Sequence, residues 1–396
     1  MHPKFANRMK KLEPAAVYEI LKRSAGRDVI PFGAGNPSPD SIPHEQIAEL
    51  AQAALKEQPI LTLQYGLTEG YSPLRAELAA FLKDKYGIGG ANDQTLITSG
   101  ATQAIELCTK AFCNEKDVII TENPTFVGAL ATFDSYDTNI IGVSMEPDGM
   151  NMEELERVLA AHNARFIYVV PNFHNPTGWT MSLDKRKRLY ELALKYGTMI
   201  LEDDPYRDLR YSGDALPSLK SMDTEGIVLY AGSFSKIISP GLRVGFLVCD
   251  EAFADKIASA KQVSDVHTPL LSQMIVYGFM QKYGLENHIA HICGIYRKKL
   301  KLALDCLDKH MGNHISYIKP DGGLYIFCKL PDGVDTMEFF EKALEAGVAV
   351  VYGSAFNVDP AKKSQYFRIN FSAPSDEQLQ VGIEILGQVL KRFIKN

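Results

Sequence analysis

The sequence predicts an α/β fold in which a mostly parallel central sheet carries helices on both faces, beside a smaller α+β domain. From residue 94 to 248, short apolar runs alternate with helical patterns, which is typical of parallel strands joined by crossover helices. After residue 251 the pattern changes to long helices and then to short strands. Because 46% of the 396 residues are hydrophobic, the chain can form one large core and a smaller second one.

The individual elements follow from the periodicity of apolar residues and from the turn residues between them. Strands are expected at 94–98, 118–121, 139–144, 165–170, 198–201, 227–231 and 244–248, with helices at 101–113, 125–133, 151–162 and 182–196. Beyond residue 251 we expect a largely helical stretch to 311, strands at 315–319, 324–330, 348–351 and 367–371, and a helix at 336–346. Capping boxes are expected at Asn151 with Glu154 and at Ser375 with Gln378, where the last helix begins.

The change of pattern divides the chain into two expected domains. Residues 46–285 form the large domain, and residues 286–396 form the small domain together with the N-terminal segment 1–45. That segment contains one amphipathic helical pattern, Pro14–Ser24, and a stretch rich in proline and glycine from 31 to 43.

Charge and cysteine content limit the partners and the compartment. The net charge is −6, and the only basic cluster is Lys185–Arg188 on a helical pattern, which we interpret as a solvated helix face and not as a nucleic-acid patch. The six cysteines form no C-x-x-C pair, which predicts buried free thiols in a reducing compartment. No apolar run is long enough to span a membrane and no leader-like segment is found, so a cytoplasmic protein is expected.

Several common catalytic motifs are missing from the sequence. Gly33 and Gly35 begin a dinucleotide-like pattern, but Ser38 stands where the third glycine belongs. The sequence contains no Walker A loop, no H-E-x-x-H and no G-x-S-x-G. We therefore predict neither a metal site nor a serine hydrolase.

The most informative segment is the loop between the expected strands at 227–231 and 244–248. A lone lysine in such a loop is usually only solvated, but Lys236 lies close to Ser233, Ser235 and Arg243. Hydroxyls and a guanidinium suit a phosphate dianion. A lysine amine beside them is able to form an imine with an aldehyde cofactor.

Three other loops are expected to meet this one, because ligands bind beyond the carboxyl ends of parallel strands. Asn175 lies in the loop after the strand at 165–170, and Asp203 and Tyr206 follow the strand at 198–201. A third loop leads into a helix at Ala101 and Thr102, where backbone N–H groups and the helix dipole form an anion site.

Taken in order, these motifs resemble a known enzyme family. They are Gly35-Asn36-Pro37, Ser99-Gly100-x-x-Gln103, Asn175-Pro176-Thr177-Gly178, Asp203-x-x-Tyr206 and the segment from Ser233 through Lys236 and Arg243 to Gly245. The set is similar to the class I aminotransferases of the fold-type I pyridoxal-phosphate (PLP) enzymes, and most similar to the kynurenine and 2-aminoadipate aminotransferase branch. The resemblance extends from Phe32 to Phe393.

The resemblance implies a role for each polar residue at the cofactor. Lys236 would hold PLP as a Schiff base and, once released, move the proton between the substrate Cα and C4′ of the cofactor. Asp203 would keep the pyridine nitrogen protonated; Asp204 is the rival by residue type. Tyr206 and Asn175 would contact the ring oxygen O3′.

The resemblance also implies how the rest of the cofactor and the substrate are held. Phe126 would stack on the ring, and the phosphate would be bound by Ala101, Thr102, Ser233, Ser235 and Arg243. Tyr65 would reach the phosphate across a dimer interface, so a homodimer is expected. Arg368 would bind the substrate α-carboxylate in a bidentate manner, beside Gly35 and Asn175. The bonds Asn175-Pro176 and Asn123-Pro124 are expected to be cis.

Substrate choice is predicted from the N-terminal segment. Dicarboxylate-selective relatives have an arginine near the position where this sequence has Tyr18, so Tyr18 is expected to contact the substrate. Arg8 and Arg23 are interpreted here as solvated charges. We therefore expect broad use of aromatic, aliphatic or 2-aminoadipate-like amino acids, with a 2-oxo acid as acceptor.

Three alternatives remain open at this point. A C–S β-lyase on the same fold needs the same cofactor residues. A PLP-binding regulatory module is disfavoured because too few residues precede Gly35 for a DNA-binding domain, and the charge is acidic. A non-catalytic relative is disfavoured by the full set of polar residues around Lys236.

Overall fold

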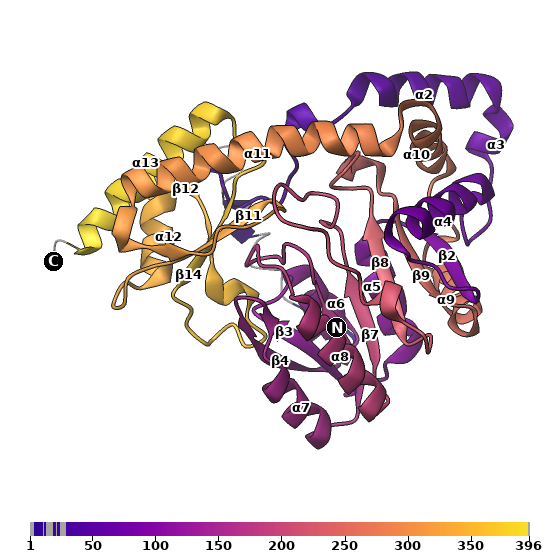
Figure 1. Cartoon of the computed structure of the whole chain (residues 1–396), viewed down its shortest axis with the longest axis horizontal. Helices are drawn as coiled ribbons and strands as arrows, with labels where there is room; N and C mark the ends of the chain where they lie inside the picture. Colours follow the sequence, from indigo (N-terminus) through magenta and orange to yellow (C-terminus); the bar gives the residue numbers. More distant parts are fainter. Residues whose placement is uncertain (1–3, 11, 13–18, 21, 24–28, 395–396) are drawn as a thin grey trace.

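The central sheet of the computed structural model has eight strands in the order β2-β9-β8-β7-β6-β3-β4-β5 (Figure 1). The structure describes residues 4–10, 12, 19–20, 22–23 and 29–394. The strands are β2 (Asp93–Thr98), β3 (Val118–Asn123), β4 (Asn139–Glu146), β5 (Gly149–Met150), β6 (Ala164–Val169), β7 (Met199–Asp203), β8 (Val228–Ser233) and β9 (Gly245–Asp250). Strands β8, β7, β6, β3 and β4 are parallel to one another, which confirms the mostly parallel prediction. Strand β9 is antiparallel to both β8 and β2, and β5 to β4.

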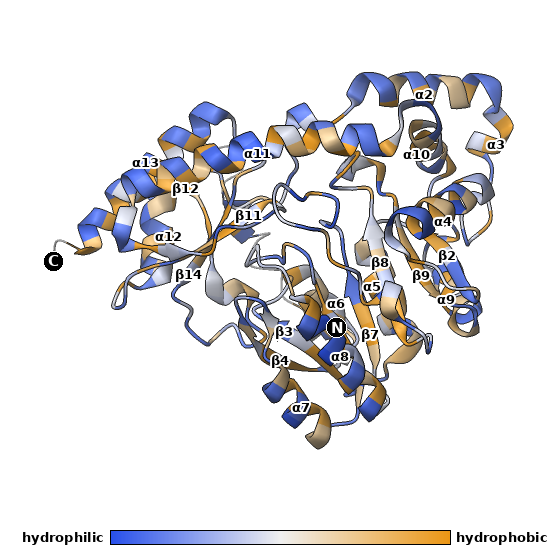
Figure 2. Cartoon of the chain, in the orientation of Figure 1, coloured by the Kyte–Doolittle hydropathy of each residue, from blue (hydrophilic) through white to orange (hydrophobic). Residues whose placement is uncertain are grey.

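Helices cover both faces of this sheet because successive strand residues point to opposite sides. In β6, Phe166 and Tyr168 pack in the same cluster as Leu107 of α5 (Ala101–Phe112). Ile167 and Val169 instead pack with Leu189 of α8 (Leu183–Tyr196). Helices α6 (Val127–Ser135), α7 (Met152–Ala161) and α9 (Glu251–Asp265) complete this part of the chain. Figure 2 shows that β7 and β9 are mainly hydrophobic, as expected for strands buried on both faces.

A second, antiparallel sheet has the order β10-β11-β14-β13. Its strands are β10 (Ser316–Tyr317), β11 (Tyr325–Lys329), β13 (Val351–Tyr352) and β14 (Tyr366–Asn370), accompanied by helices α12 (Thr336–Glu345) and α13 (Asp376–Ile394). Strand β1 (Ile30–Pro31) pairs in parallel with β12 (Val348–Ala349), so this part of the N-terminal segment lies beside the C-terminal part. Helix α11 (Leu285–His310) runs from the region of the large sheet to α13 (Figure 1). The domain boundaries at residues 45 and 285 stay a prediction.

Some local expectations differ from the structure. Helices α2 (His44–Glu57), α3 (Pro59–Leu63) and α4 (Ser72–Tyr86) are not among the expected elements, and α10 (Leu270–Tyr283) separates α9 from α11. Ser375 and Gln378 form the complete capping box, since each side chain accepts a hydrogen bond from the other's backbone N–H. At the other predicted box, the Asn151 side chain accepts a hydrogen bond from the backbone N–H of Glu154. The Glu154 carboxylate accepts from the backbone N–H of Ser144 and not from that of Asn151, so only half of that capping box exists. The predicted helix Pro14–Ser24 lies largely outside the described residues.

The interpretation of Lys185–Arg188 as a solvated face is wrong for one residue. Arg186 is fully buried. Its guanidinium donates to the carbonyls of Met181, Pro171 and Pro217 and to Asn172 Oδ1, at 2.8–3.0 Å. Because an arginine has five donors in a rigid fork, it can satisfy several carbonyls that converge from different loops. Arg186 therefore anchors the start of the loop that carries Asn175.

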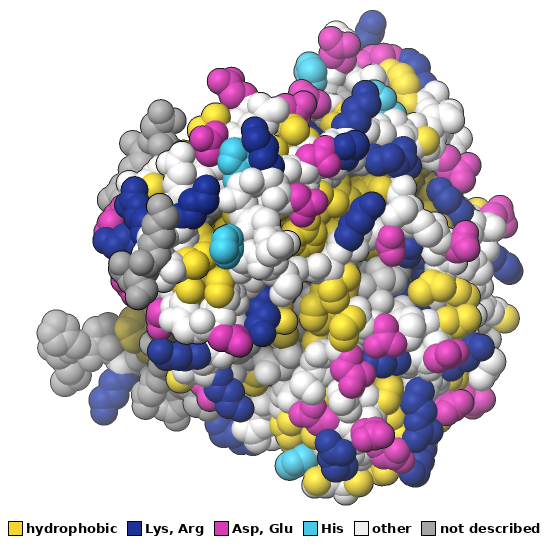
Figure 3. All heavy atoms as spheres, turned by 60° about the vertical axis from the view of Figure 1, so that its left-hand side comes forward, with side chains coloured by type: hydrophobic (Ala, Val, Ile, Leu, Met, Phe, Trp, Pro, Cys, Tyr) yellow, Lys and Arg dark blue, Asp and Glu magenta, His cyan; other side chains and the backbone are white. Residues whose placement is uncertain are grey.

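All six cysteines are free, and five of them are buried. Among the described residues, no helix is long and apolar enough to cross a membrane. On the face shown in Figure 3, basic and acidic side chains are interspersed, and hydrophobic side chains gather in the hollow near its centre.

Candidate active site

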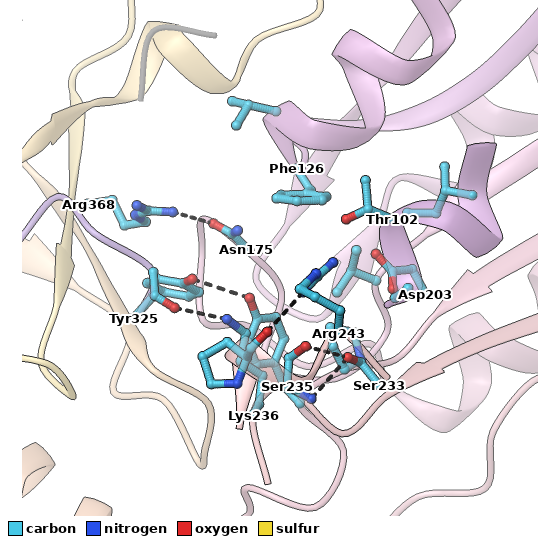
Figure 4. A pocket seen from close by; sticks show the side chains of 18 residues that line it. Thr102, Phe126, Asn175, Asp203, Ser233, Ser235, Lys236, Arg243, Tyr325 and Arg368 are labelled. Atoms are coloured by element: carbon cyan, nitrogen blue, oxygen red, sulfur yellow. Dashed lines mark hydrogen bonds between the residues drawn. The ribbon is translucent and has the colours of Figure 1, made fainter. Parts of the chain in front are cut away.

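One pocket brings together nearly all of the predicted site residues (Figure 4). It lies where β7 and β8 end and where α5 begins, with contributions from the loop after β6 and from β14. The predicted residues that line it are Gly35, Ala101, Thr102, Phe126, Asn175, Asp203, Tyr206, Ser233, Ser235, Lys236, Arg243 and Arg368. Tyr65 does not line it, and Tyr18 lies outside the described residues.

Lys236 presents its amine inside this pocket. Its Nζ donates to the carbonyl of Gly35 at 2.9 Å. Burial lowers the pKa of Lys236, and the nearby positive charges of Arg368 and Arg243 act in the same direction, whereas Tyr325 opposes them. A lowered amine pKa increases the fraction of neutral amine, which is the form that attacks an aldehyde.

Asp203 is the carboxylate at the floor of the pocket. Its Oδ2 accepts a hydrogen bond from the Tyr168 hydroxyl at 2.7 Å, while its buried Oδ1 has no hydrogen-bond partner among the described residues. Burial raises the pKa of Asp203 to about 7. An unpartnered buried carboxylate oxygen that lines a pocket fits a protonated ring nitrogen, because an opposite charge would favour the ionised form.

Asp204, the rival by residue type, is already engaged elsewhere. It forms an ion pair with Arg207 at 2.9 Å and accepts from Asn172 Nδ2 at 2.8 Å. It does not line the pocket. Glu202 accepts from the backbone N–H groups of Leu219 and Lys220, so both neighbours of Asp203 have structural partners.

One end of the pocket, here called the anion-binding end, is suited to an anion because it is formed at the start of α5. Gly100 is the N-cap and has no side-chain capping bond, so the first N–H groups of the helix remain available. Arg243 Nη2 donates to the carbonyl of Ser99 at 3.0 Å. A Cβ at Gly100 would lie 2.5 Å from Arg243 Nη2, so only glycine lets the guanidinium lie against this turn. Ser233 Oγ donates to Ser235 Oγ at 2.9 Å on the same side.

Arg368 is a buried cation at the opposite end of the pocket, with only 2% of its surface exposed. Its Nη1 donates to Asn175 Oδ1 and its Nη2 to the carbonyl of Gly33, both at 2.7 Å, while Nε has no hydrogen-bond partner among the described residues. Burial lowers the pKa of Arg368. A buried positive charge held by neutral groups is matched to an anionic ligand, because uncompensated burial of a charge is costly.

Phe126 lines the pocket, and both proline bonds have the expected isomer. Phe126 immediately precedes α6, and a Cβ at Gly128 would lie 2.5 Å from its ring, so glycine leaves space for the aromatic side chain. The bonds Asn123-Pro124 and Asn175-Pro176 are both cis, which confirms the prediction.

Three residues that support the site were not predicted. Tyr168 binds Asp203, Arg186 holds the loop before Asn175, and Tyr325 lines the pocket with its hydroxyl 3.2 Å from that of Tyr206. The sequence contains one signal for Tyr325. The pair Gly322-Gly323 directly before a strand indicates close backbone approach, and a Cβ at Gly322 would lie 2.2 Å from the carbonyl of Leu209.

The residues of the pocket fit one cofactor part by part. The amine of Lys236 suits an aldehyde, and the free Oδ1 of Asp203 suits a ring nitrogen. The start of α5 suits a phosphate. The fold and this donor set define a PLP-dependent enzyme. The comparisons with known proteins then give the family.

The chain belongs to the class I and II aminotransferase family, whose model matches residues 27–386. It is 35% identical to aromatic-amino-acid aminotransferase 1 of Thermococcus litoralis, over 99% of this chain and 95% of that protein. The multiple substrate aminotransferase of Thermococcus profundus superposes with a TM-score of 0.94 at 35% identity, covering 99% and 98% of the two chains. The α-aminoadipate aminotransferase of Thermus thermophilus, complexed with N-(5′-phosphopyridoxyl)-L-leucine, has a TM-score of 0.91 at 33% identity, covering 99% and 98%.

The protein is therefore a PLP-dependent aminotransferase, as the resemblance implied. The relatives named above are all aminotransferases, so nothing in the comparisons favours a C–S lyase.

The burial of Asp203 has a measurable consequence for the cofactor-free protein. A carboxyl whose pKa rises from 3.8 to about 7 on folding binds its proton more tightly in the folded state. Its contribution to stability is therefore complete below pH 3.8 and is lost as the pH rises through 7. We expect cofactor-free Asp203→Asn to be more stable than the wild type at pH 8 by about 1–4 kcal/mol, and equally stable at pH 4. Thermal unfolding at both values is the measurement, and a difference that does not change with pH would contradict the assignment.

Proposed function

We propose that this aminotransferase moves the amino group of an aromatic, aliphatic or 2-aminoadipate-like L-amino acid to a 2-oxo acid. The observation that carries the proposal is that Lys236, the free Oδ1 of Asp203 and the buried Arg368 face one pocket. When bound, PLP stabilises the negative charge that remains when the substrate Cα loses its proton. Lys236 Nζ is the group in this pocket that would take the proton from the substrate Cα and transfer it. Asp203 keeps the ring nitrogen protonated.

The remaining side chains orient the reacting groups. Asn175 and Tyr206 would hold the ring oxygen, and Phe126 would cover the ring face. Arg368 retains unused N–H groups, including Nε, with which to bind an α-carboxylate. Ala101, Thr102, Ser233, Ser235 and Arg243 would hold the phosphate.

The pocket chemistry supports a broad range of amino donors. Lys236, Arg243 and Arg368 are the cationic side chains among the described residues that line it, and each has one of the roles given above. Arg23 forms a largely exposed ion pair with Glu341. The described lining therefore holds no further cation that would select donors with a side-chain carboxylate over aromatic and aliphatic donors. The relatives' names, which include aromatic, multiple-substrate and α-aminoadipate enzymes, support the same breadth.

The proposal is tested by the visible absorption of the cofactor-bound protein during addition of single amino acids. We expect leucine, phenylalanine and 2-aminoadipate to bleach the absorption, and 2-oxoglutarate to restore it. Bleaching by one class of donor alone would contradict broad specificity. Release of pyruvate from cysteine conjugates without bleaching would contradict amino transfer as the main reaction.

We further propose that the enzyme is a homodimer with shared sites. The segment 60–67 exposes Ile60, Leu63, Tyr65 and Leu67, and Tyr65 is 79% exposed. An exposed apolar group of this kind is typical of a protein interface. Tyr65 contacts the ring of His267 edge-on, close to Thr268, which lies 3.1 Å from Ser99 beside the anion-binding end.

The six free cysteines support a reducing compartment and hence a cytoplasmic location.

Shared sites predict complementation between two chains with different defects. We expect Tyr65→Ala to weaken cofactor binding by tenfold or more, roughly the loss for one hydrogen bond to a charged group. A co-expressed mixture of Tyr65→Ala and Lys236→Ala chains should contain mixed dimers with one intact site and one doubly defective site. Rates measured at limiting PLP should then exceed those of either variant alone. Mixed dimers as inactive as the separate variants would show that Tyr65 does not act across the interface.

A further inference from the structure

Tyr325 is a buried residue of the pocket to which neither the sequence motifs nor the proposed function gives a role. It is the first residue of β11, and its register partner in β14 is Asn370. Figure 4 shows it between Arg368 and Lys236. A polar side chain in this position lies between the proposed carboxylate-binding cation and the amine that reacts.

The ring of Tyr325 forms one wall of the Arg368 site. The guanidinium carbon of Arg368 lies 4.4 Å from the Tyr325 ring centroid and 4.9 Å from that of Phe356. Its Nη1 and Nη2 are held by Asn175 and Gly33. Arginine stacks well on aromatic faces, and the attraction is stronger when the pair is desolvated, as it is here. The two rings therefore help to confine the guanidinium of Arg368.

The hydroxyl of Tyr325 points the other way, towards the cofactor residues. It lies 3.2 Å from the Tyr206 hydroxyl, and the two rings meet edge to face with centroids 5.8 Å apart. A Cβ at Gly35 would lie 2.7 Å from this hydroxyl, so glycine at that position leaves it room. The carbonyl of the same Gly35 accepts the hydrogen bond from Lys236.

We propose that Tyr325 is a positioning residue that links the two ends of the site: its ring holds the Arg368 guanidinium in place, and its hydroxyl fixes the hydroxyl of Tyr206. This inference rests on the proposed roles of Arg368 at the α-carboxylate and of Tyr206 at the cofactor ring oxygen. One residue of β11 thus sets both the position of the substrate carboxylate and the hydrogen bond that Tyr206 offers.

The hydroxyl is tested by a double-mutant cycle of Tyr206→Phe and Tyr325→Phe. A donor withdrawn from the ring oxygen leaves more negative charge beside the cofactor-bound Lys236 nitrogen, which raises the pKa of that nitrogen. A spectroscopic pH titration of the cofactor-bound protein measures this pKa. We expect Tyr325→Phe to raise it by about 0.3–1 pH unit, the range that one hydrogen bond supplies, and to raise it no further when Tyr206 is already phenylalanine. Tyr211→Phe is the matched control, since that buried hydroxyl donates to the carbonyl of Gly323 outside the pocket.

The ring is tested by comparing Tyr325→Phe with Tyr325→Leu. The probe is 4-methylpentanoate, which has a carboxylate and no amine. We expect Tyr325→Phe to bind it as the wild type does, and Tyr325→Leu to bind it about 10- to 30-fold more weakly, because the desolvated cation–π pair is lost. Calorimetry on the cofactor-bound protein gives both affinities.

The outcomes separate this inference from the assignments beneath it. The link through the hydroxyls is wrong if Tyr206→Phe shifts the measured pKa and Tyr325→Phe does not. It is also wrong if Tyr325→Phe shifts the pKa by the same amount in the Tyr206→Phe background as in the wild type. If Arg368→Ala weakens binding of 4-methylpentanoate and Tyr325→Leu does not, the role of the ring is wrong. If neither Tyr206→Phe nor Arg368→Ala has an effect, the underlying roles fail, and the inference fails with them.

Discussion

Replacing Lys236 by alanine is expected to abolish amino transfer. The Lys236 amine is held in the pocket by the Gly35 carbonyl, and burial lowers its pKa. In the alanine variant, no other described lysine that lines the pocket can take the proton from the substrate Cα. Proton transfer by a positioned side chain contributes roughly 10²–10⁴-fold to a rate, and loss of the covalent link to the cofactor adds to this. We therefore expect a fall in kcat of at least about 10³-fold.

The cofactor is expected to remain bound to Lys236→Ala, because the groups at the start of α5 and Arg243 are untouched. Borohydride reduction followed by mass spectrometry should find the cofactor attached at Lys236 in the wild type and nowhere in the variant. Lys236→Arg is the matched control, since it keeps the positive charge and most of the volume but cannot form the imine. If Lys236→Arg transferred amino groups at the wild-type rate, charge and packing would explain the role of Lys236 and its amine chemistry would not.

The second large effect is expected for Arg368→Ala. Truncation of one partner of a desolvated charge pair costs about 2–5 kcal/mol, which is roughly a 30-fold to several-thousand-fold loss in kcat/KM. The loss should be specific to the α-carboxylate, because Arg368 contacts Asn175 and Gly33 and lies away from the anion-binding end formed by α5. Cofactor affinity is therefore expected to change little.

An amine without a carboxylate makes this test selective. The slow half-reaction of 2-phenylethylamine should proceed at similar rates in the wild type and Arg368→Ala, while that of phenylalanine should fall sharply. Arg368→Lys is expected to recover only part of the loss, since a lysine cannot form the bidentate pair. Equal losses for both amino donors would place the α-carboxylate site elsewhere.

Much of the site could be predicted because each of its motifs is local. Asn175, Asp203 and Ser233 lie at or just after β6, β7 and β8, and the carboxyl ends of parallel strands meet at one edge of a sheet. The capping box of Ser375 and Gln378 is also local, because the two residues are close in sequence and bind each other's backbone N–H groups. The spacing of Leu74, Leu78 and Leu82 carries a helical signal for α4 as well, although that helix is not among the expected elements.

Other features could not be predicted because they join segments that are far apart in the chain. The burial of Arg186 depends on carbonyls of Pro171 and Pro217 that converge only after folding. The direction of β9 is set by its pairing with β2 and β8 and not by its own residues. Tyr325 approaches Tyr206 across 119 positions of sequence.

The sequence by itself determined the family and the cofactor, and it predicts which lysine reacts, because these depend on residue types at fixed spacing in short loops. Only the tertiary structure decided how those groups are tuned. Asp203 has a raised pKa and a free Oδ1 because it is buried beside Tyr168. Arg368 is a buried cation because Tyr325, Phe356 and the Gly33 carbonyl enclose it. Burial and solvation arise from packing between distant segments, and no local pattern of residues records them.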